Sequence, residues 1–153
     1  MNNYGGFFIL HRDGRPGLML SDAFGMDKVK PLMKNFIDDF SDVNKLVQIN
    51  FGAKGYLYKS ELDEWDQNNL RFSSHYVSSL DAFYDKLNVE LKKLMFQSGI
   101  RPDIYVSGLE DFVNEVVAGL EQSGFDKENI IVDQGGEDPS CGGGCNSCSS
   151  GCS

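Results

Sequence analysis

Four cysteines near the carboxyl end of the chain are the residues whose type and spacing most suggest chemistry. They are Cys141, Cys145, Cys148 and Cys152, which form the pattern C-x3-C-x2-C-x3-C among glycine and serine residues. Four thiolates at such short intervals can hold an iron–sulfur cluster or a tetrahedral zinc ion, and glycine lets the backbone wrap closely around either one. Disulfides and free thiols are the alternatives, although two bridges across such small loops would remove little chain entropy. We therefore expect a metal site in the tail, with an iron–sulfur cluster as first choice and zinc as second.

A turn near the amino end is the second place where the residues point to chemistry. Residues 17–20 form a short apolar run that predicts a buried strand, and a helical pattern follows it. In an open α/β sheet, such a turn binds nucleotide phosphates through backbone N–H groups and a helix N-terminus. Here glycine is scarce, because Gly25 is followed by Met26, Asp27 and Lys28. Bulk at Met26 and negative charge at Asp27 predict a weak phosphate site.

Composition limits the kinds of partner that this chain can have. The 153 residues are 41% hydrophobic and 24% charged, and the formal net charge is -9. This balance predicts one globular domain and argues against a nucleic-acid surface, which needs clustered Lys and Arg. Neither a signal peptide nor a transmembrane segment is expected, so we expect a cytoplasmic protein. The shift to Gly, Ser, Asp and Cys divides the chain into a domain at 1–136 and a cysteine-rich tail at 137–153.

Alternating strand and helix patterns predict the elements that must position these residues. A short apolar strand at 7–10 precedes the sheet, and the expected sheet strands are 17–20, 46–51, 70–77, 103–108 and 130–132. The expected helices are 29–40, 59–67, 80–97 and a last one that buries 112–120 and stops before Gly124. This order predicts an α/β fold, doubly wound, with a mostly parallel five-stranded sheet, helices on both faces and a Cys/Gly-rich C-terminal tail.

Four segments, in the right order, resemble the NAD(P)-binding domain of the ferredoxin-NADP reductase superfamily. Tyr4-Gly5-Gly6-Phe7-Phe8 resembles the end of that family's flavin domain, and residues 15–31 resemble its first strand and Gly-Thr-Gly-Ile-Ala-Pro turn. Phe51-Gly52-Ala53-Lys54 resembles the Tyr-Gly-Ala-Arg segment, and residues 103–111 resemble the Tyr-Val-Cys-Gly-Pro turn. The resemblance extends from about residue 4 to about residue 136 and implies a nucleotide-binding fold.

The same resemblance implies a set of residues at the nucleotide site. Met26-Asp27-Lys28 stands where the family has Gly-Thr-Gly, and Ser107 replaces a cysteine that lies near the nicotinamide in the family. We therefore expect weak or absent NAD(P)H binding, and no flavin on this chain alone because only a fragment of the flavin domain is matched. The candidate cofactor-binding positions are Gly25, Lys28, Gly52, Lys54, Ser107 and Gly108.

No catalytic residue can be assigned from the sequence. His11 and His75 have no acidic partner at motif spacing, so both are expected to be surface or sheet residues. Ser107 has no adjacent general base. A complete reductase activity is therefore not expected of this chain by itself.

Three functions remain open from the sequence. The first is a subunit of a redox or electron-transfer complex, an oxidoreductase component with an iron–sulfur centre that works with other protein subunits such as a redox protein or a flavoprotein. The second is a non-catalytic accessory subunit that keeps the reductase-like domain as a docking surface. The third is a metal-handling or assembly factor, which is supported only by the cysteine-rich tail.

Overall fold

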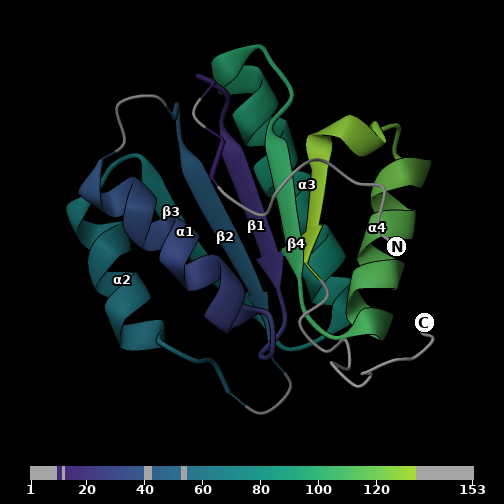
Figure 1. The fold of residues 1–153 in the computed structure, drawn as a ribbon, viewed down its shortest axis with the longest axis horizontal. Helices are drawn as coiled ribbons and strands as arrows, with labels where there is room; N and C mark the ends of the chain where they lie inside the picture. Colours follow the sequence, from purple (N-terminus) through teal and green to yellow (C-terminus); the bar gives the residue numbers. More distant parts are fainter. Residues whose placement is uncertain (1–9, 12, 40–42, 53–54, 134–153) are drawn as a thin grey trace, which may run out of the picture.

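The computed structural model describes residues 10–11, 13–39, 43–52 and 55–133. They form one five-stranded sheet in the order β3-β2-β1-β4-β5, in which all neighbouring strands are parallel (Figure 1). The strands are β1 (Gly17–Ser21), β2 (Leu46–Phe51), β3 (Phe72–Val77), β4 (Asp103–Ser107) and β5 (Ile130–Asp133). The helices are α1 (Met26–Asp38), α2 (Lys59–Asn68), α3 (Leu80–Ser98), α4 (Glu110–Gln122) and the short 3-10 helix η1 (Lys127–Asn129). The predicted α/β class and doubly wound sheet are confirmed.

Different helices cover the two faces of this sheet. Helices α1 and α2 lie on one face, and α3 and α4 lie on the other (Figure 1). Because successive strand residues point to opposite faces, Leu18 and Leu20 pack with α3 and α4, whereas Met19 packs with α1 and α2. Burial on both faces explains why β1 and β4 are continuous apolar runs in the sequence rather than alternating ones.

The strand order creates a crossover between β1 and β4. The chain adds β2 and β3 on one side of β1, returns through α3, and then adds β4 and β5 on the other side. Helix α3 begins at the N-cap Ser79, whose hydroxyl accepts the N–H of Ala82, and ends at Gly99 in a left-handed conformation (φ 74°). The turns after β1 and β4 therefore meet at the carboxyl edge of the sheet, where ligands bind in open α/β folds.

Helix α1 differs from the sequence expectation at its first turn. It begins at Met26 rather than at residue 29, because the backbone is already wound there: the N–H of Met26 bonds to the carbonyl of Asp22 at 3.1 Å. Met26 is fully buried in the core under α1, so its bulk does not enter the turn. Met26, Asp27 and Lys28 therefore belong to the helix and not to a phosphate loop.

Some predicted features lie outside the described residues. These are residues 7–9 of the first apolar strand, the boundary between domain and tail at 136/137, and the whole tail. Leu10, the last residue of that predicted strand, is described and buried but is not part of a strand. Within the described part of the chain, no helix combines the length and apolar character needed to cross a membrane.

Candidate functional site

The carboxylate of Asp22 lies where the turns after β1 and β4 meet at the carboxyl edge of the sheet, which we call the crossover edge. Asp22 follows β1 directly and is 7% exposed. Its Oδ1 accepts the backbone N–H of Gly25 at 2.8 Å, and its Oδ2 accepts the backbone N–H of Leu109 at 3.0 Å. Leu109 is the residue that precedes α4. One buried carboxylate therefore joins the turn after β1 to the turn after β4.

Two glycines allow these turns to approach each other this closely. A Cβ on Gly25 would lie 1.9 Å from the carbonyl oxygen of Ser107, and a Cβ on Gly108 would lie 2.5 Å from Oδ1 of Asp22. Only glycine fits at these two positions without movement of the Ser107 backbone or the Asp22 side chain. The N–H of Gly108 also bonds to the carbonyl of Asp133 at 3.3 Å, which ties the turn to the end of β5. The sequence-predicted Gly25, Ser107 and Gly108 thus lie together, packed against protein.

Three polar side chains lie side by side in the strands that lead to the crossover edge. Asn50, Ser21 and Ser107 are register partners on β2, β1 and β4, and all three are fully buried. The amide Nδ2 of Asn50 donates to the carbonyl and hydroxyl oxygens of Ser21 and to the carbonyl of Asp22, each at 3.2 Å. Among the described residues, Asn50 Oδ1 and Ser107 Oγ have no hydrogen-bond partner. Ser107 is therefore a buried strand residue with no described general base bonded to its hydroxyl.

The remaining predicted site residues are not part of this cluster. Lys28 is exposed in the first turn of α1. Gly52 follows β2, where a Cβ would lie 2.3 Å from the carbonyl oxygen of Gly55, so its role here is to allow a tight loop. Lys54 lies outside the described residues. The same is true of the predicted metal ligands Cys141, Cys145, Cys148 and Cys152.

A groove of about 270 Å³ opens beside Asp22 at this edge. Its apolar wall includes Phe51 and Phe112, whose rings stack with centroids 5.9 Å apart and planes inclined by 7°. Three carboxylates of this groove give it a negative rim, which repels phosphate. The lining residues are Asp22, Phe51, Leu80, Leu109, Asp111, Phe112 and Glu115.

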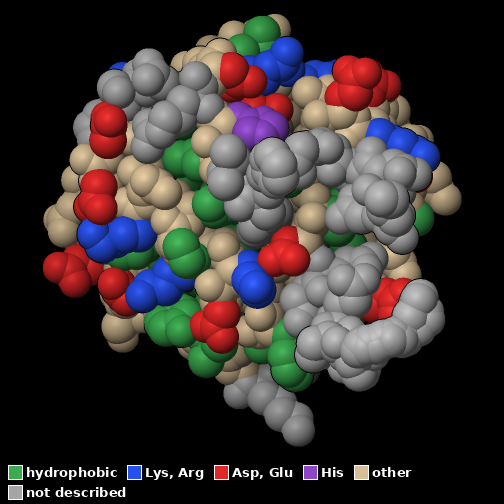
Figure 2. All heavy atoms as spheres, in the orientation of Figure 1, with side chains coloured by type: hydrophobic (Ala, Val, Ile, Leu, Met, Phe, Trp, Pro, Cys, Tyr) green, Lys and Arg blue, Asp and Glu red, His purple; other side chains and the backbone are tan. Residues whose placement is uncertain are grey.

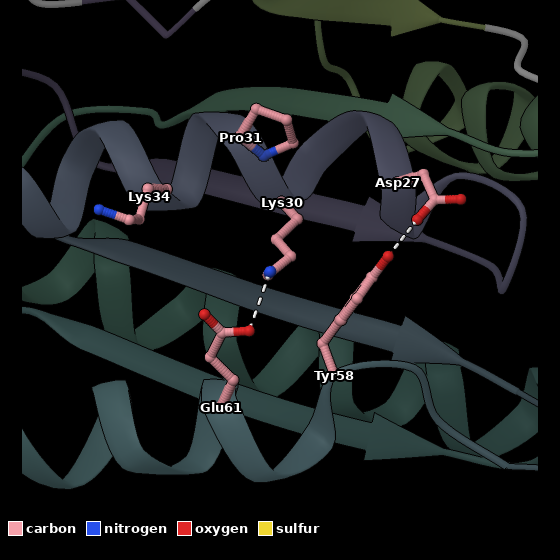
Figure 3. A pocket seen from close by; sticks show the side chains of 6 residues that line it. All are labelled: Asp27, Lys30, Pro31, Lys34, Tyr58 and Glu61. Atoms are coloured by element: carbon pink, nitrogen blue, oxygen red, sulfur yellow. Dashed lines mark hydrogen bonds and ion pairs between the residues drawn. The ribbon is translucent and has the colours of Figure 1, made fainter.

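A second pocket, of about 320 Å³, lies between α1 and the start of α2 (Figure 3). Its lining carries two acidic and two basic side chains: Lys30 lies 2.9 Å from Glu61, Lys34 lies 2.9 Å from Asp38, and Tyr58 donates its hydroxyl to Asp27 at 2.6 Å. The Asp27 hydrogen bond, followed by its negative charge, raises the pKa of Tyr58. Over the same side of the molecule, acidic and basic side chains are interspersed (Figure 2). The pocket therefore offers no unbalanced charge to an ionic ligand, and Asp27 points to α2 instead of to the turn.

No protein-family model and no curated protein sequence matches this chain. Solved structures do match it. The ferredoxin-NADP+ reductase of Plasmodium falciparum superposes with a TM-score of 0.65 at 18% identity, over 84% of this chain and 56% of that chain. The FAD/NAD-binding domain of nitric oxide dioxygenase from Vibrio cholerae gives a TM-score of 0.61 at 18% identity, over 84% and 54%. This chain has a ferredoxin reductase-like fold.

The likeness to ferredoxin reductase-like structures concerns the fold. A cytochrome P450 reductase from Amycolatopsis also matches, with a TM-score of 0.60 at 12% identity over 80% of this chain and 38% of that one. This chain therefore spans only about half, or less, of the length of these structures.

At the crossover edge of this ferredoxin reductase-like domain, an internal carboxylate already binds two backbone N–H groups. A pyrophosphate needs free backbone N–H groups and close approach to the backbone. Here the N–H groups of Gly25 and Leu109 already bond to Asp22, and Gly25 is in contact with Ser107. An external anion at this edge would compete with Asp22 for these two N–H groups.

The sequence analysis did not identify Asp22 as the residue that binds the backbone N–H groups of both turns. The local signal was present, since an aspartate directly after a buried strand and three residues before a glycine is typical of a turn in which the side chain bonds to the backbone. The contact with Leu109 had no such signal, because the two residues are 87 positions apart.

Proposed function

We propose that this chain is a subunit of an electron-transfer complex in which the ferredoxin reductase-like domain carries a cysteine-ligated metal centre and does not bind NAD(P) itself. The observation that carries this proposal is the Asp22 carboxylate, which takes the backbone N–H groups of Gly25 and Leu109 at the crossover. In this proposal, the domain keeps the fold, its own carboxylate occupies the backbone N–H groups of the crossover edge, and other subunits dock on its surface. The proposal therefore combines the redox and accessory functions expected from the sequence.

The names of similar structures support a redox setting for this fold. Besides the reductases above, a ferredoxin reductase in carbazole 1,9a-dioxygenase superposes with a TM-score of 0.58 at 13% identity. In this proposal, a flavoprotein or another redox protein exchanges electrons with the metal centre of this chain. This assignment of partners is part of the proposal.

The position of the last strand supports a link between the tail and the crossover edge. β5 ends at Asp133, whose carbonyl accepts the N–H of Gly108. Cys141 follows eight residues later, so it stays within about 28 Å of the end of β5 even in a fully extended chain. In the proposal, this reach allows a centre held by the tail to contact the edge that carries the groove.

The four thiols provide the ligand set for one centre. An iron–sulfur cluster is our first choice and would supply one-electron chemistry, and zinc is the alternative. Glu137 and Asp138 come just before the first cysteine, so a basic partner surface would stabilise the tail.

Anaerobic purification of the full chain tests this function. We expect iron and acid-labile sulfide, or zinc, in stoichiometric amount, together with the visible spectrum that an iron–sulfur cluster would give. The double variant Cys145→Ser/Cys148→Ser should lose the metal and keep the far-ultraviolet circular dichroism and unfolding midpoint of the wild type. Wild-type protein with neither iron nor zinc would overturn the proposed metal centre.

A second candidate function rests on the stacked Phe51 and Phe112 rings in the groove. A flat apolar wall of this kind can stack on a planar heteroaromatic ring, so the groove could take such a ring without a phosphate site. Titration with nicotinamide riboside, which carries no phosphate, tests this candidate, because saturable binding that is lost in Phe112→Ala is expected only if the groove holds the ring.

A further inference from the structure

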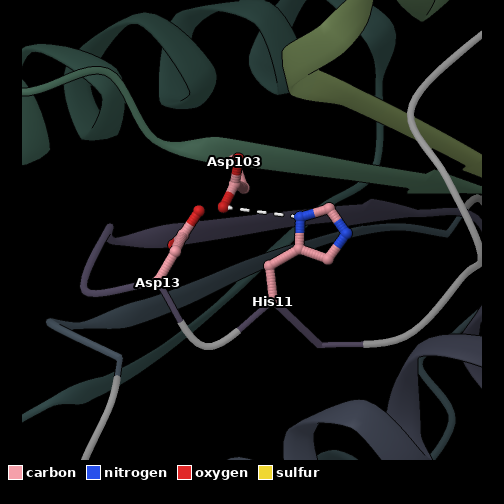
Figure 4. A group of neighbouring side chains, drawn as sticks. All are labelled: His11, Asp13 and Asp103. Carbon is pink, nitrogen blue, oxygen red and sulfur yellow. Dashed lines mark ion pairs between the residues drawn. The ribbon is translucent and has the colours of Figure 1, made fainter.

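Three potential metal ligands gather at the amino edge of the sheet, opposite the crossover edge. His11 and Asp13 belong to the segment before β1, and Asp103 is the first residue of β4 (Figure 4). One ligand atom from each residue can be chosen so that all three lie within 4.8 Å of one another. The shortest ion-pair distance joins His11 Nδ1 to Asp103 Oδ2, at 3.7 Å.

Backbone contacts hold all three residues in place. The N–H of Asp103 donates to the carbonyl of Pro16 at 3.0 Å, and the N–H of His11 donates to the hydroxyl of Tyr105 at 2.7 Å. The His11 ring also lies edge-on to the Tyr105 ring, with centroids 5.9 Å apart. Asp13 is fixed by its own turn, since its Oδ1 accepts the N–H of Arg15 at 3.2 Å. The ligand groups are therefore positioned by the fold and not by an ion.

The charge balance of this cluster favours a cation. The Asp103 side chain is only 5% exposed, yet it lies next to a second carboxylate, that of Asp13. Arg15 Nε is 3.6 Å from Asp13 Oδ2 and is 40% exposed, so solvent weakens its contribution. A second positive charge between the two carboxylates would stabilise the cluster.

We propose that His11, Asp13 and Asp103 bind one divalent transition-metal ion through one imidazole nitrogen and two carboxylate oxygens. Mixed nitrogen and oxygen ligands suit Zn²⁺, Mn²⁺ and Co²⁺, with water at the remaining positions. Bonds of about 2.1 Å place such ligand atoms about 3 to 3.5 Å apart, so binding requires a side-chain movement of about 1 Å. The ion would clamp the segment before β1 to β4. This site is independent of the proposed redox function and of the tail.

The test uses the full chain with the four tail cysteines replaced by serine, so that metal bound by thiolates does not contribute. Calorimetric titration with ZnCl₂ near neutral pH should show one ion per chain, and Co²⁺ should give a visible spectrum without sulfur charge-transfer bands. Zinc should also raise the thermal unfolding midpoint. Absence of saturable zinc binding would overturn the proposal.

Two ligand variants separate a metal site from a cluster of ion pairs. His11→Gln and Asp103→Asn should each weaken zinc binding by about tenfold or more. His11 is partly exposed, so its variant is expected to fold even if the Asp103 variant does not. The matched control is Asp85→Asn, an exposed aspartate on α3 outside the cluster, which should bind zinc as the parent does. Equal zinc affinity in the parent and His11→Gln would show that these residues form ion pairs only.

Discussion

The carboxylate of Asp22 accepts the backbone N–H of Leu109 at 3.0 Å, although the two residues are 87 positions apart in the sequence. The same carboxylate accepts the N–H of Gly25 at 2.8 Å. These bonds cross the point where the strand order of the sheet reverses, and this is where an open α/β fold normally admits a ligand. The side chain that closes the crossover edge is therefore also one that holds the fold together.

Replacement of Asp22 should destabilise the domain. Asp22→Ala leaves the N–H groups of Gly25 and Leu109 without their carboxylate, so we expect the free energy of unfolding to fall by about 2 to 3 kcal/mol. Urea denaturation followed by circular dichroism measures this change. Asp85→Asn, on the exposed face of α3, should stay within about 0.5 kcal/mol of the wild type. Wild-type stability in Asp22→Ala would show that the bridge contributes nothing.

Gly25 should tolerate no side chain. Its φ of -75° suits any residue, but a Cβ would lie 1.9 Å from the carbonyl oxygen of Ser107. We expect Gly25→Ala to lower the free energy of unfolding by about 3 kcal/mol or more, because backbone must move on both sides of the contact. The control is Gly119→Ala in α4, where the nearest atom is a flexible Tyr84 ring atom at 3.3 Å. If both alanine variants unfold at the same urea concentration, the contact between Gly25 and Ser107 does not exclude a side chain.

His75 should make the domain less stable in mild acid. Burial lowers the pKa of His75 on β3; Glu90 and Asp66 oppose this shift, whereas Lys86 and Lys93 add to it. As the pH falls through about 6.5, the unfolded chain takes up a proton that the folded domain binds more weakly. The urea midpoint should therefore fall between about pH 7.5 and about pH 5.5. His75→Gln should reduce this fall, whereas an unchanged pH profile in the variant would assign the effect to other groups.

The sequence predicted the elements well where the pattern is local. The bounds of β2 at 46–51 agree with the prediction, and α3 ends where Gly99 takes the left-handed conformation expected of a helix C-terminus. Gly25, Ser107 and Gly108 were expected at one nucleotide edge, and the parallel sheet does bring them together because the carboxyl ends of its strands share an edge. Local spacing was sufficient for the elements, whereas the shared edge was expected from the family resemblance.

Contacts between distant segments could not be predicted in the same way. Met26 and Asp27 were expected to obstruct the phosphate turn, but Met26 is buried under α1 and Asp27 accepts the hydroxyl of Tyr58. The group that closes the edge is Asp22, and its partner Leu109 comes from another βα unit. The pairing of His11 with Asp103 is equally invisible in the sequence, because it depends on β1 and β4 being neighbours.

Titration of the full, folded chain with NADPH and NADH tests the closed nucleotide edge most directly. If Asp22 holds the backbone N–H groups of the crossover, isothermal calorimetry should show no saturable binding of either nucleotide up to about 1 mM. A dissociation constant of about 10 μM or tighter for either nucleotide would contradict the account.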